Sequence, residues 1–239
     1  MKITIINGTG VKGCTWHLKE IFLNAVKNGN EITEFTLPKD MPEFCCGCKN
    51  CFFNGEEKCP HAAYTLPIWN AIMRSDLIVF TYPVYALRAP GSIKALLDHY
   101  CVHWMVHRPK EEMFSKRVAI LTNSIGAPNG AAQKDTATSF SWLGVSDIRK
   151  LGFGLMEHVL WEMISEKRRA KMQAKTERFA KKCLRPIRKS SLKVTAFFIF
   201  CKMMHKRAYK KELAQGQEPL LDNLYWAEKG WIKTKPIVS

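Results

Sequence analysis

The sequence lacks a run of apolar residues long enough to cross a membrane. Its longest apolar-rich stretch, Thr195 to Met204, is far shorter than the roughly 20 residues that a membrane-spanning helix needs. A charged start followed by an apolar segment, which marks a secretory signal peptide, is also absent. We therefore expect a soluble protein of the cytoplasm.

Internal repeats and low-complexity tracts are absent too, and 46% of the 239 residues are apolar. That share is ample for a buried core, so we do not expect disorder over most of the chain. The length accommodates one α/β domain with an appendage. We place the domain at residues 1–185 and a helical C-terminal extension at residues 186–239.

Acidic side chains are scarce in one part of the chain, between Glu166 and Glu212. This segment has 17 Lys or Arg against 3 Asp or Glu, so it carries most of the net charge of +16. Basic nucleic-acid sites usually interleave aromatic residues with the charges, whereas here the aromatic residues gather at Phe197 to Phe200. The pattern argues against nucleic acid, although binding of nucleic acid or an anionic membrane through this segment stays an alternative function.

The same segment predicts two helices. A long, mostly solvated helix is expected from about Met156 to Arg185, with a break near Pro186. In the next helix, four consecutive apolar residues, Phe197 to Phe200, leave no helical face free of them, so we expect burial against another surface. We predict a homodimer through these helices and favour it over attachment to a membrane surface. The flanking lysines and arginines would also attract an acidic redox partner.

Short buried strands alternate with amphipathic helices through the first 155 residues. The strands are expected at 2–6, 31–36, 77–80, 117–122 and 145–153, and the helices at 16–26, 62–73, 92–105 and 130–142. Consecutive apolar positions are typical of parallel strands that are covered on both faces. The alternation predicts a three-layer α/β fold with a doubly wound parallel sheet.

A glycine-rich turn, Asn7 to Thr15, joins the first strand to the first helix. Backbone N–H groups at such a helix start converge on an anion, and the lysine and threonines of the turn add donors, which indicates a phosphate site. The same turn spells the G-x-G-x-x-G fingerprint of Rossmann dehydrogenases, with Glu34 about 20 residues further on. A phosphate site, a dinucleotide site and a tight turn without a ligand all stay open here.

The stretch from Asp76 to Tyr100 is a strand, a loop and a helix. In an open α/β sheet, ligands bind at the loops that leave the carboxyl ends of central strands. The loop from Thr81 to Gly91 is rich in aromatic and apolar residues, where a plain connector would be polar. It therefore suggests a site for a flat ligand.

Four stretches of the chain carry a family resemblance. They are Asn7-Gly8-Thr9 through Lys12-Gly13-Cys14-Thr15, Thr81-Tyr82-Pro83-Val84-Tyr85, Pro90-Gly91-Ser92-Ile93-Lys94, and the cysteine-rich loop 44–60. Together they resemble the flavodoxin-like NAD(P)H-dependent oxidoreductases, also called the NADPH-dependent FMN reductase family, over roughly residues 1–155. The resemblance implies a five-stranded sheet in the order 2-1-3-4-5 that binds FMN and accepts NAD(P)H as a substrate.

Carried over by position, the resemblance also implies which residues bind FMN. The first loop would hold the phosphate through Thr9, Lys12, Gly13, Cys14 and Thr15. The loop after the third strand would line the ring through Pro83, Val84, Tyr85 and Ala86. Short polar and glycine residues after the fourth strand would permit close backbone approach, namely Asn123, Ser124 and Gly126. Two positions depart from the family pattern: Val11 stands where a basic residue is frequent, and Cys14 where Asn is.

Five of the nine cysteines lie between Cys45 and Cys59. In a large chain without a secretory signal, reduced thiols or metal ligands fit better than disulfides. The spacing of Cys45, Cys48, Cys51 and Cys59 is similar to the compact motif of the iron–sulfur flavoprotein branch of the family, which implies a [4Fe–4S] cluster. A tetrahedral zinc site and plain reduced thiols stay open as alternatives.

Three histidines, His99, His103 and His107, recur every four residues. That spacing would place them on one helical face, but no carboxylate completes an obvious metal site. We therefore favour a structural or pocket-lining role for them.

We predict an FMN-dependent NAD(P)H oxidoreductase that passes electrons to a small acceptor, such as a quinone, a flavin or a nitro compound, or to a redox protein. An alternative is a flavodoxin-like or iron–sulfur electron carrier. A Rossmann dehydrogenase is the remaining enzyme alternative, and the aromatic loop after the third strand counts against it.

Overall fold

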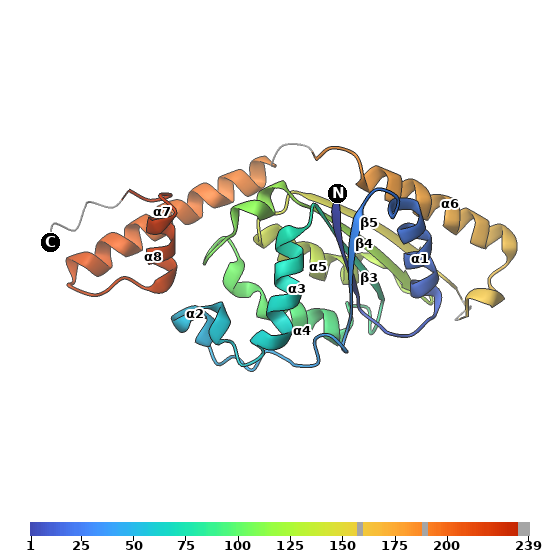
Figure 1. The fold of residues 1–239 in the computed structure, drawn as a ribbon, viewed down its shortest axis with the longest axis horizontal. Helices are drawn as coiled ribbons and strands as arrows, with labels where there is room; N and C mark the ends of the chain where they lie inside the picture. The colour runs from blue at the N-terminus through green and yellow to red at the C-terminus, as the bar shows by residue number, and fades with distance from the viewer. Residues whose placement is uncertain (157–159, 188–190, 234–239) are drawn as a thin grey trace.

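A computed structural model describes residues 1–156, 160–187 and 191–233. It has five parallel strands, β1 (Lys2–Asn7), β2 (Glu31–Thr36), β3 (Leu77–Pro83), β4 (Arg117–Ser124) and β5 (Asp147–Gly154). They form one sheet in the order β2-β1-β3-β4-β5, which is seen nearly edge-on in Figure 1. The predicted flavodoxin-like fold is therefore confirmed.

Helices cover both faces of the sheet, as Figure 1 shows. One face packs against α1 (Cys14–Val26) and α6 (Glu166–Cys183), and the other against α3 (Ala62–Arg74), α4 (Gly91–His99) and α5 (Gly130–Trp142). The central strands β3 and β4 are buried along most of their length, which explains why their apolar residues are consecutive rather than alternating. Two apolar cores result, one on each face.

The strand register brings three loops to one edge of the sheet. Asn7 at the end of β1 lies beside Thr81 of β3. Pro83 at the end of β3 lies beside Asn123 of β4. The loops that follow β1, β3 and β4 therefore emerge together, at the edge where doubly wound folds bind their ligands.

Two helix boundaries differ from the sequence prediction. The helix expected at 92–105 ends at His99, and a short 3₁₀ helix, η2 (Cys101–His103), follows it. The turn at Tyr100 buries that ring and lets its hydroxyl bind the carbonyl of Thr65 at 3.1 Å. The helix expected from about Met156 begins only at Glu166, and three of the residues expected in it, 157–159, lie outside the described residues.

The late start of α6 has a visible cause. Before it, the 3₁₀ helix η4 (Trp161–Met163) lies against α1, and the Trp161 ring stacks on His17 with centroids 5.0 Å apart. The chain therefore packs against α1 through η4 before α6 begins. The expected break near Pro186 agrees with the structure, since α6 ends at Cys183 and α7 (Leu192–Ala214) begins after it.

The C-terminal helices α7 and α8 (Leu221–Glu228) form a third apolar cluster with the segment after α4. In Figure 1, α7 extends away from the sheet and α8 folds back beside it. Phe198 stacks on Trp226 at 5.1 Å, and Phe197 packs edge-on against Trp142 at 4.7 Å. Two of the four residues of the predicted apolar patch, Phe197 and Phe198, are thus partly buried within the chain itself.

The other half of that patch faces outward. Ile199, Phe200 and Met203 each expose about half of their surface. The predicted homodimer would cover them, and it stays a prediction. Within the described parts of the chain, none of the helices has the length and apolarity that a bilayer crossing requires.

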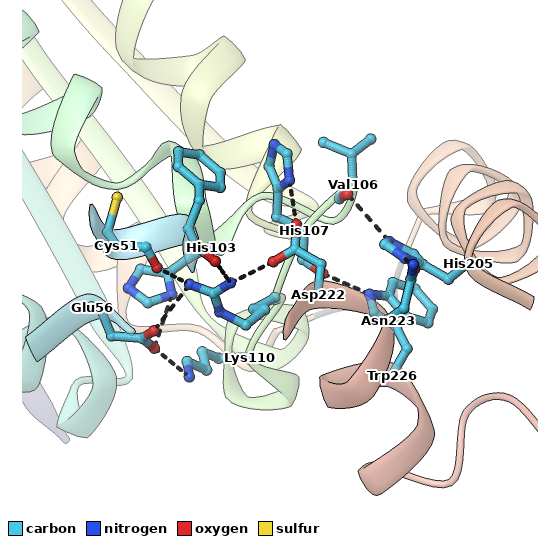
Figure 2. Close-up of polar contacts among 12 residues, drawn as sticks. Cys51, Glu56, His103, Val106, His107, Lys110, His205, Asp222, Asn223 and Trp226 are labelled. Atoms are coloured by element: carbon cyan, nitrogen blue, oxygen red, sulfur yellow. Dashed lines mark hydrogen bonds and ion pairs between the residues drawn. The ribbon is translucent and has the colours of Figure 1, made fainter. Parts of the chain in front are cut away.

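The segment from Val106 to Lys110 lies between the C-terminal helices and the cysteine-rich loop and contacts both (Figure 2). Its backbone carbonyls accept hydrogen bonds from Trp226 at 2.6 Å and Tyr225 at 2.5 Å. Its Arg108 side chain is buried and binds Asp222 of α8 on one side and Glu56 of the cysteine-rich loop on the other. The extension is therefore attached by polar contacts as well as by the apolar cluster.

Candidate functional site

The loop between β1 and α1 presents a helix start to the edge of the sheet. Gly13 precedes the helix and offers no side-chain cap, and the first turn of α1 contains no acidic residue. The N–H groups of that turn and the positive end of the helix dipole therefore favour an anion. Lys12 is exposed in the same loop. This helix start could therefore receive an anion, and the phosphate site stays a prediction.

Gly8 lets this loop pass close to its neighbours. A Cβ atom at this position would lie 2.6 Å from Cβ of Tyr82 and 2.8 Å from Cγ1 of Ile93. Both neighbours are fully buried, so they have no free space to move into. A glycine is needed here because of contact with β3 and α4.

We expect Gly8→Ala to lower the free energy of unfolding by about 1–3 kcal/mol, which is typical of overpacking a buried position. Gly13→Ala is the matched control, because a Cβ there would meet nothing within 4 Å. Urea unfolding of both variants measures the difference. Equal midpoints for the two would show that the contact with Tyr82 and Ile93 does not constrain the loop.

The carboxylate of Glu34 already has two partners within the protein. It accepts a hydrogen bond from Asn7 at 2.7 Å and pairs with Lys19 at 2.8 Å. Burial alone would lower the pKa of Lys19, but Glu20 and Glu34 raise it above its ordinary value. Glu34 is therefore not free to bind a ribose, and the sheet order is of the flavodoxin type rather than the classical dinucleotide-binding order. Both observations remove the Rossmann alternative.

The loop after β3 is a tight turn. Tyr85 and Arg88 form two backbone hydrogen bonds, of 3.0 and 2.9 Å, and between them Ala86 and Leu87 have φ angles of 47° and 65°. Two left-handed residues in succession are unusual without glycine and carry strain. Asp135 of α5 holds the turn by pairing with Arg88 at 2.7 Å. The turn leaves the Tyr85 ring about half exposed at the sheet edge.

The carboxyl end of β4 is hydrogen-bonded to the loop after β3 and to the first turn of α1. The carbonyl of Asn123 accepts a hydrogen bond from the backbone of Val84 at 2.8 Å. Its side chain accepts a hydrogen bond from the hydroxyl of Thr15. Thr15, Asn123 and Ser124 are buried, whereas Gly126 is exposed. The end of β4, the loop after β3 and the start of α1 therefore form one connected layer.

A cleft of about 580 Å³ opens in this layer, between the first loop and α4. Such a volume is typical of sites for small molecules and cofactors. Among the predicted residues, Thr9 and Tyr85 line the cleft, while Lys12 and Thr15 line a second hollow of about 160 Å³ beside α1. Sequence reasoning missed part of the wall, namely Pro38, Met41, Pro42 and Phe44. The two prolines marked that segment as a turn, but its position over the cleft is a tertiary feature.

The cysteine-rich loop borders the same cleft, because Phe44 in its wall precedes Cys45. The thiols of Cys45 and Cys48 are exposed, and those of Cys51 and Cys59 are half-buried. Burial raises the pKa of Cys59, a hydrogen bond from the backbone of His61 opposes this, and the nearby Cys48 and Cys45 raise it further. The predicted ligands are thus close enough to influence one another, and the four-thiolate site stays a prediction.

One group of metal-ligand atoms within the described residues is more compact. The ligand atoms of Cys59, His61 and His99 all lie within 4.8 Å of one another. The other two histidines of the four-residue series are elsewhere. His103 stacks on Trp69 at 4.0 Å, and His107 binds Asp222 at 2.8 Å, which agrees with the structural role expected for them.

Comparisons with known proteins agree with this fold. The profile of a family described as NADPH-dependent FMN reductase matches residues 1–157. An FMN-dependent NADH-azoreductase from Bacillus anthracis, solved in complex with FMN, is similar at 14% identity with a TM-score of 0.59, over 77% of this chain and 100% of that one. An NAD(P)H:quinone oxidoreductase from Methanothermobacter marburgensis is similar at 14% identity with a TM-score of 0.60, over 79% and 99%. These identities establish the fold alone, and no curated protein sequence matches the chain.

Proposed function

The chain belongs to the NADPH-dependent FMN reductase family, and we propose that it is an FMN-dependent oxidoreductase that passes electrons from NAD(P)H to a small flat acceptor such as a quinone, a flavin or a nitro compound. The observation that carries the proposal is the cleft at the carboxyl ends of β1 and β3, which aromatic side chains line, together with the hollow beside it at the uncapped start of α1.

The residues present fit FMN. The first turn of α1, with Lys12 and the hydroxyl of Thr9 beside it, would bind the phosphate, because oriented N–H groups and a cation favour a dianion there. Tyr85 and Pro90 would provide the flat apolar wall for the ring. Bound FMN would supply the hydride chemistry, so the protein needs only to bind, orient and shield it.

The open face of the cleft indicates the kind of acceptor. Phe44 and Tyr85 line it and are both largely exposed, so a planar molecule could stack on them from solvent. The nicotinamide and the acceptor would then occupy the same face one after the other. The names of the similar structures, an azoreductase and a quinone oxidoreductase, support planar acceptors of this size.

We expect Lys12→Glu to weaken FMN binding by at least about 10-fold, which corresponds to about 1.4 kcal/mol, because it places a carboxylate where a cation faces the phosphate. Lys27→Glu is the control with the same charge change, since Lys27 is exposed at the other end of α1. Fluorescence titration of FMN into the flavin-free protein measures both affinities.

The activity itself is tested by mixing the FMN-loaded protein with NADPH, and separately with NADH, without air. Loss of the flavin absorbance within seconds, and its return on adding a quinone, is the expected result. A protein that binds no FMN, or whose bound FMN is reduced by neither nicotinamide, would contradict the proposal.

A further inference from the structure

Cys59, His61 and His99 come from two separate segments and meet beside the cofactor cleft. Cys59 and His61 flank Pro60 at the end of the cysteine-rich loop, and His99 is the last residue of α4. Nδ1 of His61 lies 2.9 Å from Nε2 of His99, and the Cys59 sulfur lies within 4.8 Å of both. His99 is buried, and the other two side chains are half-buried. The three potential ligand atoms thus face a common point.

The outer hydrogen bonds show which atom of each ring faces that point. Nδ1 of His99 lies 2.7 Å from the carbonyl oxygen of Ala95, which only accepts, so this nitrogen carries the proton and Nε2 presents a lone pair. Nε2 of His61 lies 4.0 Å from the carboxylate of Glu43, which is beyond hydrogen-bond distance, but the negative charge of Glu43 favours a proton on Nε2 and a lone pair on Nδ1. Two lone pairs at 2.9 Å repel unless a proton or a metal cation lies between them.

The same arrangement is typical of metal-binding histidines. Such a histidine usually donates its second N–H to a carbonyl or a carboxylate, which fixes the tautomer and orients the ring. The Cys59 sulfur also accepts a hydrogen bond from the backbone N–H of His61, so the sulfur acts as an acceptor toward its own loop. His99 and Cys59 therefore have hydrogen-bonded outer partners in place, and the Glu43 carboxylate lies 4.0 Å from Nε2 of His61.

We propose that Cys59, His61 and His99 bind a Zn²⁺ ion, with the Cys48 thiolate as the fourth ligand. A set of two sulfurs and two imidazole nitrogens is a common tetrahedral zinc site. Cys48 is the thiol named because, of the exposed thiols in the same loop, it has the largest electrostatic effect on Cys59. A [4Fe–4S] cluster takes four thiolates instead, and the compact group in this structure contains one thiol and two imidazoles.

Zinc at this position would have a structural role in the cleft. Ala95, whose carbonyl binds His99, lines the cleft, and so does Phe44 at the start of the cysteine-rich loop. The ion would attach that loop to the end of α4 and so fix one wall of the cleft. The proposal does not depend on the proposed oxidoreductase activity, because metal content is measured without flavin or nicotinamide.

Elemental analysis of the full chain, purified in metal-depleted buffer without chelator, is expected to give one zinc per chain. His99→Ala and Cys59→Ser should bring the zinc content to background. Cys46→Ser is the matched control, because Cys46 is an exposed thiol of the same loop outside the proposed ligand set, and it should retain zinc fully. Circular dichroism of each variant shows whether it is folded.

Cys51→Ser separates zinc from a cluster, because Cys51 belongs to the four-thiolate set and not to the proposed zinc site. Zinc retained in Cys51→Ser but lost in His99→Ala supports the proposal. Iron and labile sulfide that are lost in Cys51→Ser but retained in His99→Ala would overturn it, as would a wild-type protein with no bound metal.

A cobalt titration of the metal-free wild type tests the site without relying on a variant that fails to fold. Tetrahedral cobalt with thiolate ligands gives intense visible bands and thiolate-to-metal charge transfer, and we expect both at one equivalent. In Glu43→Gln, which changes only the partner of His61, cobalt affinity should fall by about 10- to 100-fold. Octahedral bands alone, or an affinity unchanged by Glu43→Gln and Cys48→Ser together, would overturn the proposed ligands.

Discussion

Replacing Arg108 with Met is expected to lower the free energy of unfolding by about 3–5 kcal/mol, the usual cost of breaking a buried ion pair by removing one partner. Arg108 is almost fully buried, and its guanidinium binds the carboxylates of Asp222 and Glu56. It also donates to the backbone carbonyls of Cys51 and Phe52, the latter at 3.2 Å. One side chain therefore joins α8, the cysteine-rich loop and the segment after α4.

The loss of Arg108 would remove a positive charge that balances the carboxylates of Glu56 and Asp222. Figure 2 shows Glu56 and Asp222 on opposite sides of this contact, with Lys110 beside Glu56 and His107 beside Asp222. Burial lowers the pKa of His103 to about 3, so His103 is neutral at pH 7 and does not replace the lost charge. We expect α8 and the short helix α2 (Asn50–Asn54) of the cysteine-rich loop to separate from the segment between them.

Lys110→Met is the matched control. Lys110 pairs with the same Glu56 at 3.0 Å, but it is partly exposed and binds no other carboxylate among the described residues. Its removal should cost about 1 kcal/mol or less. Urea unfolding measures both variants, and adding Glu56→Gln and Asp222→Asn to Arg108→Met should restore part of the stability. Equal losses for Arg108→Met and Lys110→Met would contradict the role given to burial.

The same network makes the free energy of unfolding depend on pH. Burial works against ionisation of Glu56, but His103, which becomes protonated only in acid, and Lys110, which also donates to the carboxylate, outweigh it and lower the pKa of Glu56 from 4.5 to about 2. A carboxyl with a depressed pKa contributes stability above its ordinary pKa, and the contribution is lost as the pH falls through the folded value. As the pH falls from 4.5 to about 2, wild type should therefore lose more of its free energy of unfolding than Glu56→Gln does. Urea unfolding of both proteins at several pH values measures the difference.

The fold could be predicted because its signals are local. Consecutive apolar residues such as Leu77 to Phe80 mark buried strands, and the glycine turn from Asn7 to Thr15 marks a strand-to-helix junction. Each signal lies within about 10 residues of sequence. The parallel sheet then follows from their alternation, because a parallel strand pair needs a crossover helix.

The contacts that define the sites are not local. His99 appeared in the sequence as one of three regularly spaced histidines, but it faces His61, which lies 38 residues earlier. The helix ends at His99, so the regular spacing with His103 and His107 does not place them on one face. Nothing in the composition distinguishes Arg108 from the other 36 basic residues. Only the packing of two loops and a C-terminal helix around it gives that residue its role.

Replacing Arg117 with Met is expected to cost about 3–5 kcal/mol as well, for the same physical reason at a different junction. Arg117 is the first residue of β4 and is fully buried. Its guanidinium binds Asp147 at the start of β5 with contacts of 2.8 and 2.5 Å. It also donates to the carbonyls of Cys183, Arg185 and Pro186, the last two at 2.6 and 3.2 Å.

These contacts place Arg117 at the exit of the chain from α6. The last carbonyls of a helix have no partner within it, and a buried cation satisfies them while complementing the negative end of the helix dipole. Met fills a similar volume without donors, so Arg117→Met would leave the end of α6 and the Asp147 carboxylate uncompensated. The C-terminal end of α6 should then become open to proteases before the rest of the domain unfolds.

Arg149→Met is the matched control, because Arg149 pairs with the same Asp147 at 3.0 Å but from a partly exposed position. It should cost about 1 kcal/mol or less. Burial alone would raise the pKa of Asp147, but Arg117 and Arg149 lower it below its ordinary value of 3.8. Ionised Asp147 therefore adds stability above that value, and the addition is lost as the pH falls through the lower folded pKa.

The two arginine variants should consequently differ in their response to acid. In Arg117→Met the pKa of Asp147 should return toward or above its ordinary value, so that acid removes less stability from the variant than from wild type in the window below 3.8. Urea unfolding at several pH values between neutrality and that window measures this. If Arg117→Met loses no more stability than Arg149→Met, or loses as much to acid as wild type does, the buried arginine does not hold the end of α6 to the sheet.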